Sequence, residues 1–471
     1  MESQPPLVVD LDGTLIKTDM LLESLVAVLQ RLPWLAFCLP FWLLRGRAGL
    51  KRELAARARW SPERIPYRAE VLDWVRAERR NGRRVVLATA SDEQLARRIA
   101  EHLGGFDDVV ASDGRDNLKG AAKRRALVER YGERGFDYVG NERADLEVWA
   151  SARRAIVVGH GALVDAAARS ALEARELRIA SARPGLLWSA LRAYQWPKNL
   201  LVFVPLITAH RVGNATAVAA SMLAFAAFCL VASAIYVVND LTDLEADRLH
   251  ATKRERPFAS GDLSIAWGLL LAPALLAASF AIALRLGPAF VSILAVYATV
   301  GLAYSLFLKR IAVLDIFVLA ALYTFRIQGG AFAIDVPVSH WLFAFSIFLF
   351  LSLALAKRHG ELKSLAGRCE VVPGRGYRPE DAGGVGTLGT VAGYLAVVVL
   401  SFYVTSVEVA ALYRQPEVLW AVVVVFLFWI TRLWLLSHRG TLGEDPLAFA
   451  LRDPASYAVA GVSLAAVFLA T

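Results

Sequence analysis

The sequence predicts two domains of different fold class: an amino-terminal α/β domain with a helical cap, then an all-α membrane domain of about nine transmembrane helices. The chain has 471 residues, is 56% hydrophobic and has a mean hydropathy of +0.46, which is too apolar for an ordinary soluble protein. Charged and apolar stretches alternate up to about residue 185, whereas long apolar runs dominate from Asn199 onward. We therefore expect the first domain at 1–165, a linker at 166–186 and the membrane domain at 187–471.

The first element is the apolar segment 7–9, which runs directly into Asp-Leu-Asp-Gly-Thr at 10–14. We interpret 7–9 as a buried strand, so that Asp10 stands at its carboxyl end, where sites form in α/β sheets. Asp12 is close enough to act as an acid or base, and Gly13 permits the sharp turn. This pattern resembles the first motif of the haloacid dehalogenase (HAD) phosphatase superfamily, which implies a Rossmann-like α/β fold.

Two further segments continue this resemblance in chain order. Residues 85–89 are predicted to form a strand that ends in the hydroxyl of Thr89, with Ser91 as the alternative hydroxyl. Lys123 fits the lysine that neutralises the phosphoaspartate in this family, and Lys119 competes for that role. The resemblance therefore implies a catalytic set made of Asp10, Asp12, Thr89 and Lys123.

The fourth motif, at 138–145, departs from the family, because Asn141 stands where an aspartate is usual. An amide oxygen can still bind Mg²⁺ but brings no charge, so we expect a lower metal affinity and a phosphatase that is weakened or lost. A non-catalytic regulatory or assembly role for this domain is the alternative. The implied Mg²⁺ ligands are Asp10, Asp12, Asn141 and Asp145.

Residues 20–80 are predicted to form a helical insert, as a cap domain of this superfamily would. Within it, the apolar segment 32–44 is too short and too interrupted by proline to span a membrane. We expect it to lie on the membrane surface with Trp34 and Trp42 at the interface, or to pack against the membrane domain. A cap that touches lipid suits a lipid-borne substrate.

The membrane half contains apolar segments separated by polar turns. By the length criterion they form about nine spans, at 199–209, 215–238, 265–284, 288–306, 311–333, 340–356, 386–408, 416–436 and 455–470. When the amino terminus is placed inside, most Lys and Arg residues fall in inside loops, including the long loop at 357–384. This asymmetry predicts a multi-pass protein of the cytoplasmic (inner) membrane whose first domain is cytoplasmic.

The remaining compositional features exclude other classes. The formal net charge of +9 follows from this positive-inside bias, so nucleic acid is not an expected partner. Cys38, Cys229 and Cys369 show neither metal-ligand spacing nor a disulfide framework. The first residues lack the basic and apolar regions of a signal peptide. The sequence leaves an oligomer open.

An acidic cluster follows the second apolar segment and consists of Asn239, Asp240, Asp243 and Asp247. Charges beside a membrane span are costly, so they are functional-site hypotheses by default. The i, i+3, i+7 spacing of the aspartates places them on one helix face. Hard oxygen ligands suit Mg²⁺, which usually brings a phosphate substrate. The cluster therefore predicts a diphosphate site at the lipid–water boundary, and a solvated acidic loop is the alternative.

Basic residues follow this cluster, and Lys253 and Arg256 either anchor the inside face or bind phosphate oxygens. The acidic pattern with these residues and Gly261 resembles the first signature of the UbiA-type prenyltransferase superfamily, over about 190–471. The stretches 196–199 and 304–315 also fit. The resemblance implies nine helices around a cavity that opens toward the lipid, and Mg²⁺-diphosphate bound by the acidic cluster with Asn239 orienting.

One departure from this superfamily is informative. Its aromatic prenyltransferases carry a second Asp-x-x-x-Asp motif after the sixth span, where this chain has Lys357 and Arg358. Fixed positive charge suits phosphate groups that arrive without their own metal. The replacement resembles the decaprenyl-phosphate phosphoribosyltransferase branch, and the stretch 444–453 fits that branch more weakly.

In that branch, an oxygen of polyprenyl phosphate attacks the anomeric carbon of 5-phosphoribosyl diphosphate, and diphosphate leaves. The implied partners are polyprenyl phosphate, phosphoribosyl diphosphate, Mg²⁺ and the bilayer. Arg326 lies within the fifth apolar segment, where it either faces the cavity or pairs with Asp315. The expected substrate-binding residues are Lys198, Asn199, Lys253, Arg256, Tyr304, Lys309, Arg326, Lys357 and Arg358.

The two halves together suggest consecutive reactions. The HAD domain would remove the 5-phosphate of the lipid-linked product, with Asp10 attacking phosphorus and Asp12 protonating the leaving oxygen. The alternative function is prenyl transfer from a prenyl diphosphate to an aromatic acceptor, which the missing second acidic motif disfavours. A transporter is disfavoured because the charges cluster at one membrane face.

Overall fold

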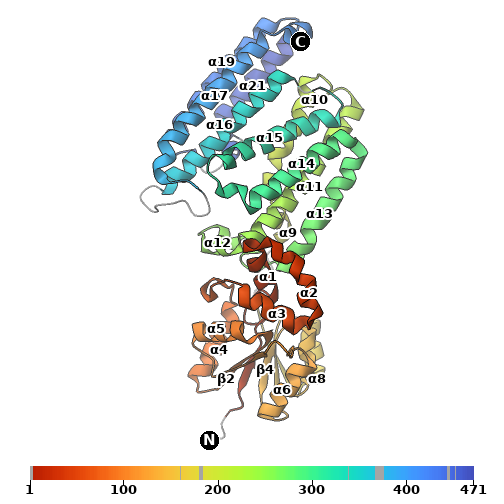
Figure 1. The fold of residues 1–471 in the computed structure, drawn as a ribbon, viewed down its shortest axis with the longest axis vertical. Helices are drawn as coiled ribbons and strands as arrows, with labels where there is room; N and C mark the ends of the chain where they lie inside the picture. The colour runs from red at the N-terminus through yellow and green to blue at the C-terminus, as the bar shows by residue number, and fades with distance from the viewer. Residues whose placement is uncertain are drawn as a thin grey trace. The chain divides into compact units, whose positions relative to one another are not determined.

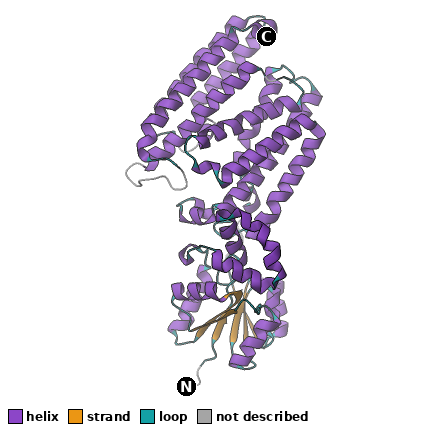
Figure 2. Ribbon diagram, in the orientation of Figure 1, coloured by secondary structure: helices purple, strands orange, loops and turns teal. Residues whose placement is uncertain are grey.

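A computed structural model describes residues 4–159, 161–179, 184–337, 339–365, 376–442, 446–450 and 452–471. The chain divides into two compact units, which are described separately below (Figure 1). The first unit contains Met1–Leu191 and Tyr236–Ala272, and the second contains Arg192–Ile235 and Pro273–Thr471. The first unit holds the described strands, and the second is helical (Figure 2).

A six-stranded parallel sheet forms the core of the first unit, in the order β3-β2-β1-β4-β5-β6. Leu7 of the central strand pairs with Val85 on one side and with Asp137 on the other. This order places a topological switch point between β1 and β4, where α/β folds bind ligands. The predicted α/β fold is confirmed. The strands are β1 Leu7–Val9, β2 Val85–Asp92, β3 Asp108–Ser112, β4 Asp137–Gly140, β5 Arg154–Val158 and β6 Glu173–Leu177.

Helices join these strands and bury their apolar faces against the sheet. Parallel strands require such crossover helices. Because helices cover both faces of the sheet, the strands are continuous apolar runs in the sequence. The sheet continues past the expected domain boundary at residue 165, because β6 pairs with β5 along its length. The helices are α4 Ala69–Arg80, α5 Glu93–Leu103, α6 Ala121–Tyr131, α7 Leu146–Trp149 and α8 Ala162–Ser170.

The helical cap consists of α1 (Met20–Arg31), a 3-10 turn at Pro33–Cys38, α2 (Leu39–Leu44) and α3 (Gly46–Arg57). Asp19 caps α1 by accepting hydrogen bonds from the amides of Leu21 and Leu22. The apolar stretch before α3 is broken into two short pieces, in agreement with the prolines that interrupt it.

Seven described helices are long and apolar enough to cross a membrane. The described part of the chain therefore does not confirm a count of nine. The first expected span is a 3-10 segment (Ala193–Phe203) followed by the short α10 (Val204–Thr208), because Pro197 and Pro205 lack amide donors. The last, α21 (Pro454–Ala470), has 17 residues. The seven are α11 Ala215–Thr242, α13 Ile265–Leu286, α14 Pro288–Leu306, α15 Leu314–Ala333, α16 His340–Leu365, α17 Ala382–Val404 and α19 Trp420–Arg439.

Short helices complete the two units. They are α9 Leu186–Ala190, α12 Leu244–Leu249, α18 Val407–Leu412 and α20 Pro446–Ala450. Residues 444, 445 and 451 of the stretch that weakly resembles the phosphoribosyltransferase branch lie outside the described residues, as does Cys369.

Candidate functional sites

A cavity of about 600 Å³ opens at the carboxyl ends of the central strands of the first unit. The sheet and cap both contribute to its walls, so the cavity lies where the strand order predicts a ligand site. The structure brings most of the predicted HAD residues together here, and the lining includes Asp10, Asp12, Ser91, Lys123, Asn141 and Asp145.

Lys123 is the cation that contacts Asp10 directly. Its Nζ donates to Asp10 Oδ1 at 2.6 Å and to the Tyr138 hydroxyl at 2.9 Å, and both charged side chains are buried. Tyr138 in turn donates to Asp145 Oδ1 at 2.9 Å. The competing residue Lys119 forms an ion pair with Glu142 instead. The geometry therefore favours Lys123 over Lys119 as the partner of Asp10.

Both candidate hydroxyls contact Asp12 rather than Asp10. Asp12 Oδ2 accepts hydrogen bonds from Ser91 Oγ at 2.7 Å and from Thr89 Oγ1 at 3.2 Å, and Oδ1 accepts from the Met20 amide at 2.8 Å. Thr89 also accepts a hydrogen bond from the Ser91 amide. Both hydroxyls therefore hold Asp12, and Ser91, the alternative residue, also lines the cavity.

Asn141 lies directly over the turn that follows Asp10. Thr14 Oγ1 is 2.9 Å from Asn141 Oδ1 and 3.3 Å from Asp10 Oδ2, so its single proton can be donated to either. Gly13 has φ of +72°, and a Cβ there would lie 2.4 Å from Asn141 Nδ2. Glycine is required at this position both by the backbone conformation and by the close approach of Asn141.

Asp145 anchors the loop that carries Asn141. Its Oδ2 accepts hydrogen bonds from the amides of Asn141 and Glu142, both at 2.9 Å. Since its Oδ1 accepts from Tyr138, both oxygens are already engaged by protein donors. Both oxygens of Asp145 therefore hold protein groups in place, and its role as a metal ligand stays a prediction.

Among the buried charges of the described residues that line the cavity, the carboxylates of Asp10 and Asp145 outnumber the one cation, Lys123. Burial raises the pKa of Asp10 to about 7; Lys123 opposes this shift, whereas Asp145 and Asp12 add to it. Burial likewise raises the pKa of Asp12, and the nearby Asp19 adds to it. For Lys123, burial alone would lower the pKa, but Asp10 and Asp145 outweigh it and the pKa is raised. An additional cation would lower the energy of the ionised carboxylates.

The donor set of this cavity fits Mg²⁺. Asp10, Asp12 and Asn141 offer hard oxygen atoms, and Mg²⁺ is commonly held by one or two carboxylates together with substrate phosphate and water. Among the residues that the structure describes, no group of three or more His, Cys, Asp or Glu side chains could hold a metal ion by itself.

The acidic cluster lies where α11 ends and α12 begins, in the part of the first unit formed by Tyr236–Ala272. The expected single helix is interrupted between Thr242 and Leu244. Hydrogen bonds from the Asp243 amide to the Asn239 carbonyl (2.9 Å) and from the Asp247 amide to the Asp243 carbonyl (2.8 Å) keep the backbone close to a helical path.

Arg256 joins the two ends of this cluster. Its Nη1 donates to Asp240 Oδ1 at 3.2 Å and to Asp247 Oδ2 at 2.6 Å, and both carboxylates are buried. Burial raises the pKa of Asp247; Arg256 lowers it and Asp243 raises it further. Lys253 begins the adjacent 3-10 turn, Lys253–Glu255. The cluster is therefore a converging pair of buried carboxylates that requires positive charge, and its oxygen atoms also fit Mg²⁺.

The cap and the segment after α11 form one interface within the first unit. Arg248 donates from both Nη atoms to Glu23, at 2.6 and 3.1 Å, and both side chains are buried. Lys17 pairs with Asp262 at 2.9 Å, and Leu22 packs in the apolar cluster around Phe258. Sequence reasoning did not single out these contacts, because the pairs lie more than 200 residues apart along the chain.

In the second unit, Arg326 is held by polar and aromatic partners. Nε donates to Asn199 Oδ1 at 2.7 Å and Nη2 to the Tyr297 hydroxyl at 2.7 Å, and the guanidinium lies over the rings of Tyr297 and Tyr323. Nη1 donates to the Leu322 carbonyl. The expected alternative, a pair with Asp315, is not what the structure shows. Tyr297 and Tyr323 were missed, because each is an aromatic residue within an apolar helix.

Asp315 pairs with Arg358 instead. Arg358 is almost fully buried and forms ion pairs with Asp315 and Glu361, while the Tyr377 hydroxyl donates to Asp315 at 2.7 Å. Two carboxylates therefore neutralise Arg358. Of the other predicted cations, Lys357 precedes Arg358 in α16, and Lys309 lies in the 3-10 turn Leu308–Arg310 that follows α14, the helix that carries Tyr304.

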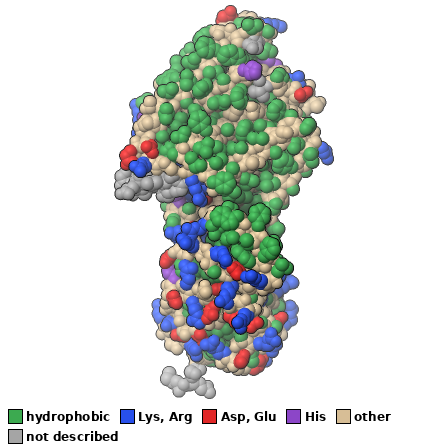
Figure 3. Space-filling model, viewed as in Figure 1, with side chains coloured by type: hydrophobic (Ala, Val, Ile, Leu, Met, Phe, Trp, Pro, Cys, Tyr) green, Lys and Arg blue, Asp and Glu red, His purple; other side chains and the backbone are tan. Residues whose placement is uncertain are grey.

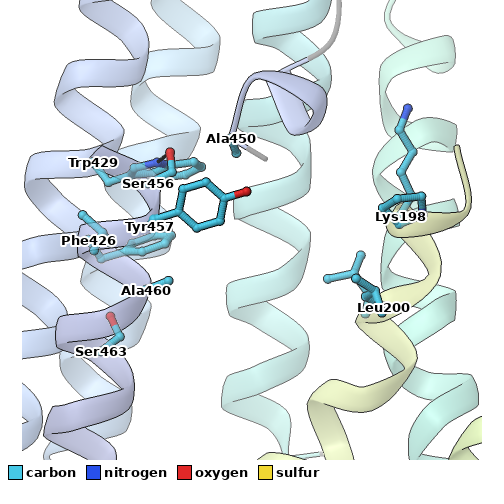
Figure 4. Close-up of a pocket in the computed structure, with 12 residues that line it drawn as sticks. Lys198, Leu200, Phe426, Trp429, Ala450, Ser456, Tyr457, Ala460 and Ser463 are labelled. Atoms are coloured by element: carbon cyan, nitrogen blue, oxygen red, sulfur yellow. Dashed lines mark hydrogen bonds between the residues drawn. The ribbon is translucent and has the colours of Figure 1, made fainter. Parts of the chain in front are cut away.

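An apolar groove of about 470 Å³ runs between the 3-10 segment that carries Lys198 and the helices α19 and α21. Figure 4 shows Tyr457 projecting between Phe426 and Trp429 on one side and Leu200 on the other, with Lys198 beside Leu200. Trp429 Nε1 donates to Ser456 Oγ at 2.8 Å. The groove is suited to an apolar chain with a polar end.

Comparisons with known proteins agree with both resemblances. The model of the UbiA prenyltransferase family matches residues 200–453, and the model of the haloacid dehalogenase-like hydrolases matches residues 7–150. Uncharacterized protein y4nM of Sinorhizobium fredii is 41% identical over 471 residues, which cover 98% of this chain and 90% of that protein.

Two relatives with more specific names match parts of the chain. Nodulation protein NoeC of Azorhizobium caulinodans is 40% identical over 284 residues, 59% of this chain and 92% of that protein. Decaprenyl-phosphate phosphoribosyltransferase of Mycolicibacterium smegmatis is 40% identical over 181 residues, 38% of this chain and 57% of that enzyme.

Proposed function

Because the chain belongs to the UbiA prenyltransferase family and carries an amino-terminal HAD-like domain, we propose that it is a phosphoribosyltransferase with a coupled phosphatase. It is an integral membrane transferase, as its family and its long apolar helices show. In this proposal, 5-phosphoribosyl moves from phosphoribosyl diphosphate to a polyprenyl phosphate, and the HAD domain then removes the 5-phosphate. Both sites face the cytoplasm.

The convergence of Asp240 and Asp247 on Arg256 is the observation that carries the transferase proposal. Two buried carboxylates need positive charge, and Mg²⁺ that arrives with the diphosphate of the donor would supply it. Arg256 would then turn its donors toward phosphate oxygens, which a guanidinium binds bidentately. The similarity to decaprenyl-phosphate phosphoribosyltransferase supports a sugar donor.

The transfer step requires positioning more than proton transfer. An ionised oxygen of the lipid phosphate forms a bond to the anomeric carbon, while the bond from that carbon to the diphosphate breaks and the electron pair leaves with diphosphate. No general base is needed, because a phosphate monoester is already ionised. The isoprenoid chain would need an apolar groove, and the groove beside Tyr457 in the second unit is a candidate for it. Catalysis would then come from orientation and fixed positive charge.

The phosphatase step follows from the contacts of Asp10 and Asp12. Asp10 would attack phosphorus, and Lys123 would offset the charge on the acyl phosphate that forms. Asp12, held by Thr89 and Ser91, would give a proton to the leaving ribose oxygen, and its raised pKa suits that role. Water then hydrolyses the acyl phosphate. Mg²⁺, when bound, would lower the repulsion between the substrate phosphate and the carboxylates.

The test uses the full chain in lipid nanodiscs with polyprenyl phosphate, Mg²⁺ and phosphoribosyl diphosphate labelled in the ribose. We expect a labelled lipid that carries ribose, and accumulation of its 5-phosphorylated form when Asp10 is replaced by asparagine. Asp240→Asn should abolish labelling, whereas Asp73→Asn, an exposed control, should not. Formation of a prenylated hydroxybenzoate from prenyl diphosphate, with no labelled lipid, would favour the alternative prenyl transfer.

A further inference from the structure

One face of the cap contributes an ordered series of side chains to the phosphatase cavity. Arg47, Leu50 and Lys51 follow the i, i+3, i+4 spacing of a single face of α3, and all three line the cavity. Lys51 reaches the carboxyl end of β2, where its Nζ donates to the Ala90 carbonyl at 2.6 Å, and it also donates to Asn117 Oδ1 at 2.9 Å. Leu43 of α2, four residues before Arg47 in the chain, also lines the cavity.

Arg47 is a cation placed apart from the catalytic carboxylates. Its side chain is exposed, and it makes no hydrogen bond or ion pair with any other residue in the described ranges. It lies one helical turn from Lys51, or about 6 Å along the axis. Arg47 and Lys51 therefore place two positive charges about one turn apart on the wall of the same cavity.

An exposed apolar strip continues outward from this face. The segment Pro33–Leu44 contains no charged residue, and five of its large side chains are more than half exposed. Contiguous apolar surfaces of this kind mark binding sites, because leaving them in water is unfavourable. Figure 3 shows hydrophobic side chains gathered where Figure 1 draws α2, with Lys and Arg side chains beside them. The strip consists of Trp34 (60%), Phe37 (80%), Phe41 (69%), Leu43 (55%) and Leu44 (84%).

We propose that this strip binds the apolar chain of the phosphatase's own substrate, an amphiphile with a terminal phosphomonoester and an internal phosphodiester. The phosphomonoester lies at Asp10, the phosphodiester at Arg47, and the chain runs from Leu43 along the strip. The site offers a carboxylate, then a cation, then an apolar surface. The substrate offers a phosphomonoester, then a phosphodiester, then an apolar chain, in the same order. This inference rests on the proposed phosphatase function and adds its substrate class and a specificity site.

The test compares two substrates with the full chain in nanodiscs: ribose 5-phosphate, and a farnesyl phosphodiester of the same ribose 5-phosphate. The strip variant carries Phe37→Ser, Phe41→Ser and Leu44→Ser, and the control variant carries Leu172→Ser, which is equally exposed elsewhere. We expect the strip variant to lose about tenfold or more in kcat/KM on the farnesyl substrate and to keep its rate on ribose 5-phosphate. Arg47→Gln should show the same selectivity.

Three results would overturn the inference. Equal losses on both substrates would mean that the strip only anchors the cap to the bilayer, and no loss on either would mean that it binds nothing relevant. A strip variant that keeps its rate on the farnesyl substrate while Arg47→Gln loses it would exclude the apolar chain from the strip.

If the wild-type protein hydrolyses neither substrate, the phosphatase function fails, and the substrate site is then decided by binding. Calorimetric titration with the farnesyl ligand in an Asp10→Asn background should give about tenfold weaker binding for the strip variant. Equal affinities with and without the strip substitutions would refute the site.

Discussion

Replacing Asn141 by aspartate tests whether the phosphatase cavity is a magnesium site that lacks one charge. Thr14 Oγ1 lies within hydrogen-bonding distance of both Asn141 Oδ1 and Asp10 Oδ2, so these two acceptors are at most about 6 Å apart. Asp12 and Asp145 line the same cavity. The substitution therefore places a further carboxylate among buried carboxylates, at a position where the chain now has a neutral amide.

The magnitude follows from Coulomb's law. At an effective dielectric constant of about 20, two like charges about 6 Å apart repel by roughly 3 kcal/mol. Without Mg²⁺ the variant should lose stability on that order, or avoid the loss by holding a proton. With a divalent cation between the same groups the interaction becomes attractive. Mg²⁺ affinity should then rise by about tenfold or more, which corresponds to about 1.4 kcal/mol.

Two measurements on the full chain decide this prediction. Calorimetric unfolding in EDTA and in Mg²⁺ gives the stability change, and hydrolysis of ribose 5-phosphate against Mg²⁺ concentration gives the affinity change. Asn81→Asp adds the same charge at an exposed position and should alter neither. If Asn141→Asp leaves both the unfolding temperature in EDTA and the half-saturating Mg²⁺ concentration unchanged, Asn141 does not belong to a metal site.

Three further predictions concern buried charges, two at the proposed sites and one at the cap interface. Because the pKa of Asp10 is raised from 3.8 to about 7 in the folded state, the native protein binds this proton more tightly than the unfolded chain. Without metal, the free energy of unfolding should therefore fall as pH rises from about 4 to 7, and Asp10→Asn should flatten this dependence in calorimetry. Arg256→Gln leaves Asp240 and Asp247 without this counter-charge, so unfolding in EDTA should occur at lower temperature and Mg²⁺ should restore more of the loss than in the wild type. Glu23→Gln leaves Arg248 buried without its carboxylate and should lower the free energy of unfolding by about 3–5 kcal/mol. Glu93→Gln, which removes a partly exposed i, i+4 pair, should lower it by less than about 1 kcal/mol by denaturant titration. Equal effects of the two substitutions would contradict the buried pair.

The parts of the phosphatase cavity that the sequence predicted are those with short-range signals. An apolar strand followed by Asp10 and Asp12 identifies the carboxyl end of a central strand, and parallel pairing then brings Asn141 to the same edge. The spacing alone could not establish that Lys123 rather than Lys119 is the partner of Asp10, because both lysines lie near the start of one helix. Only the tertiary contact with Asp10 separates them.

The membrane half was predicted less completely, because its polar contacts join residues that are distant in sequence. The expected alternative for Arg326, a pair with Asp315, is wrong, because Asn199, 127 residues away, accepts its hydrogen bond. Its position at a cavity stays a prediction. Asp315 pairs with Arg358 from the predicted basic motif. A buried arginine needs several acceptors, and hydropathy shows where such a residue lies without showing which partner supplies them.

Lys123 and Arg256, the cations that contact the carboxylates of the two sites, differ in how exposed their side chains are. Lys123 is nearly fully buried and is held by both Asp10 and Tyr138, so removing it would leave a buried carboxylate without its counter-charge. Arg256 contacts Asp240 and Asp247 from a side chain that remains 23% exposed, and its backbone lies in a loop after a 3-10 turn. A partly solvated guanidinium on a loop can leave its carboxylates at much lower cost. In the proposed mechanism, the acidic cluster is therefore the site where an incoming cation and diphosphate would replace a protein charge, whereas the HAD-domain cavity would keep its lysine throughout.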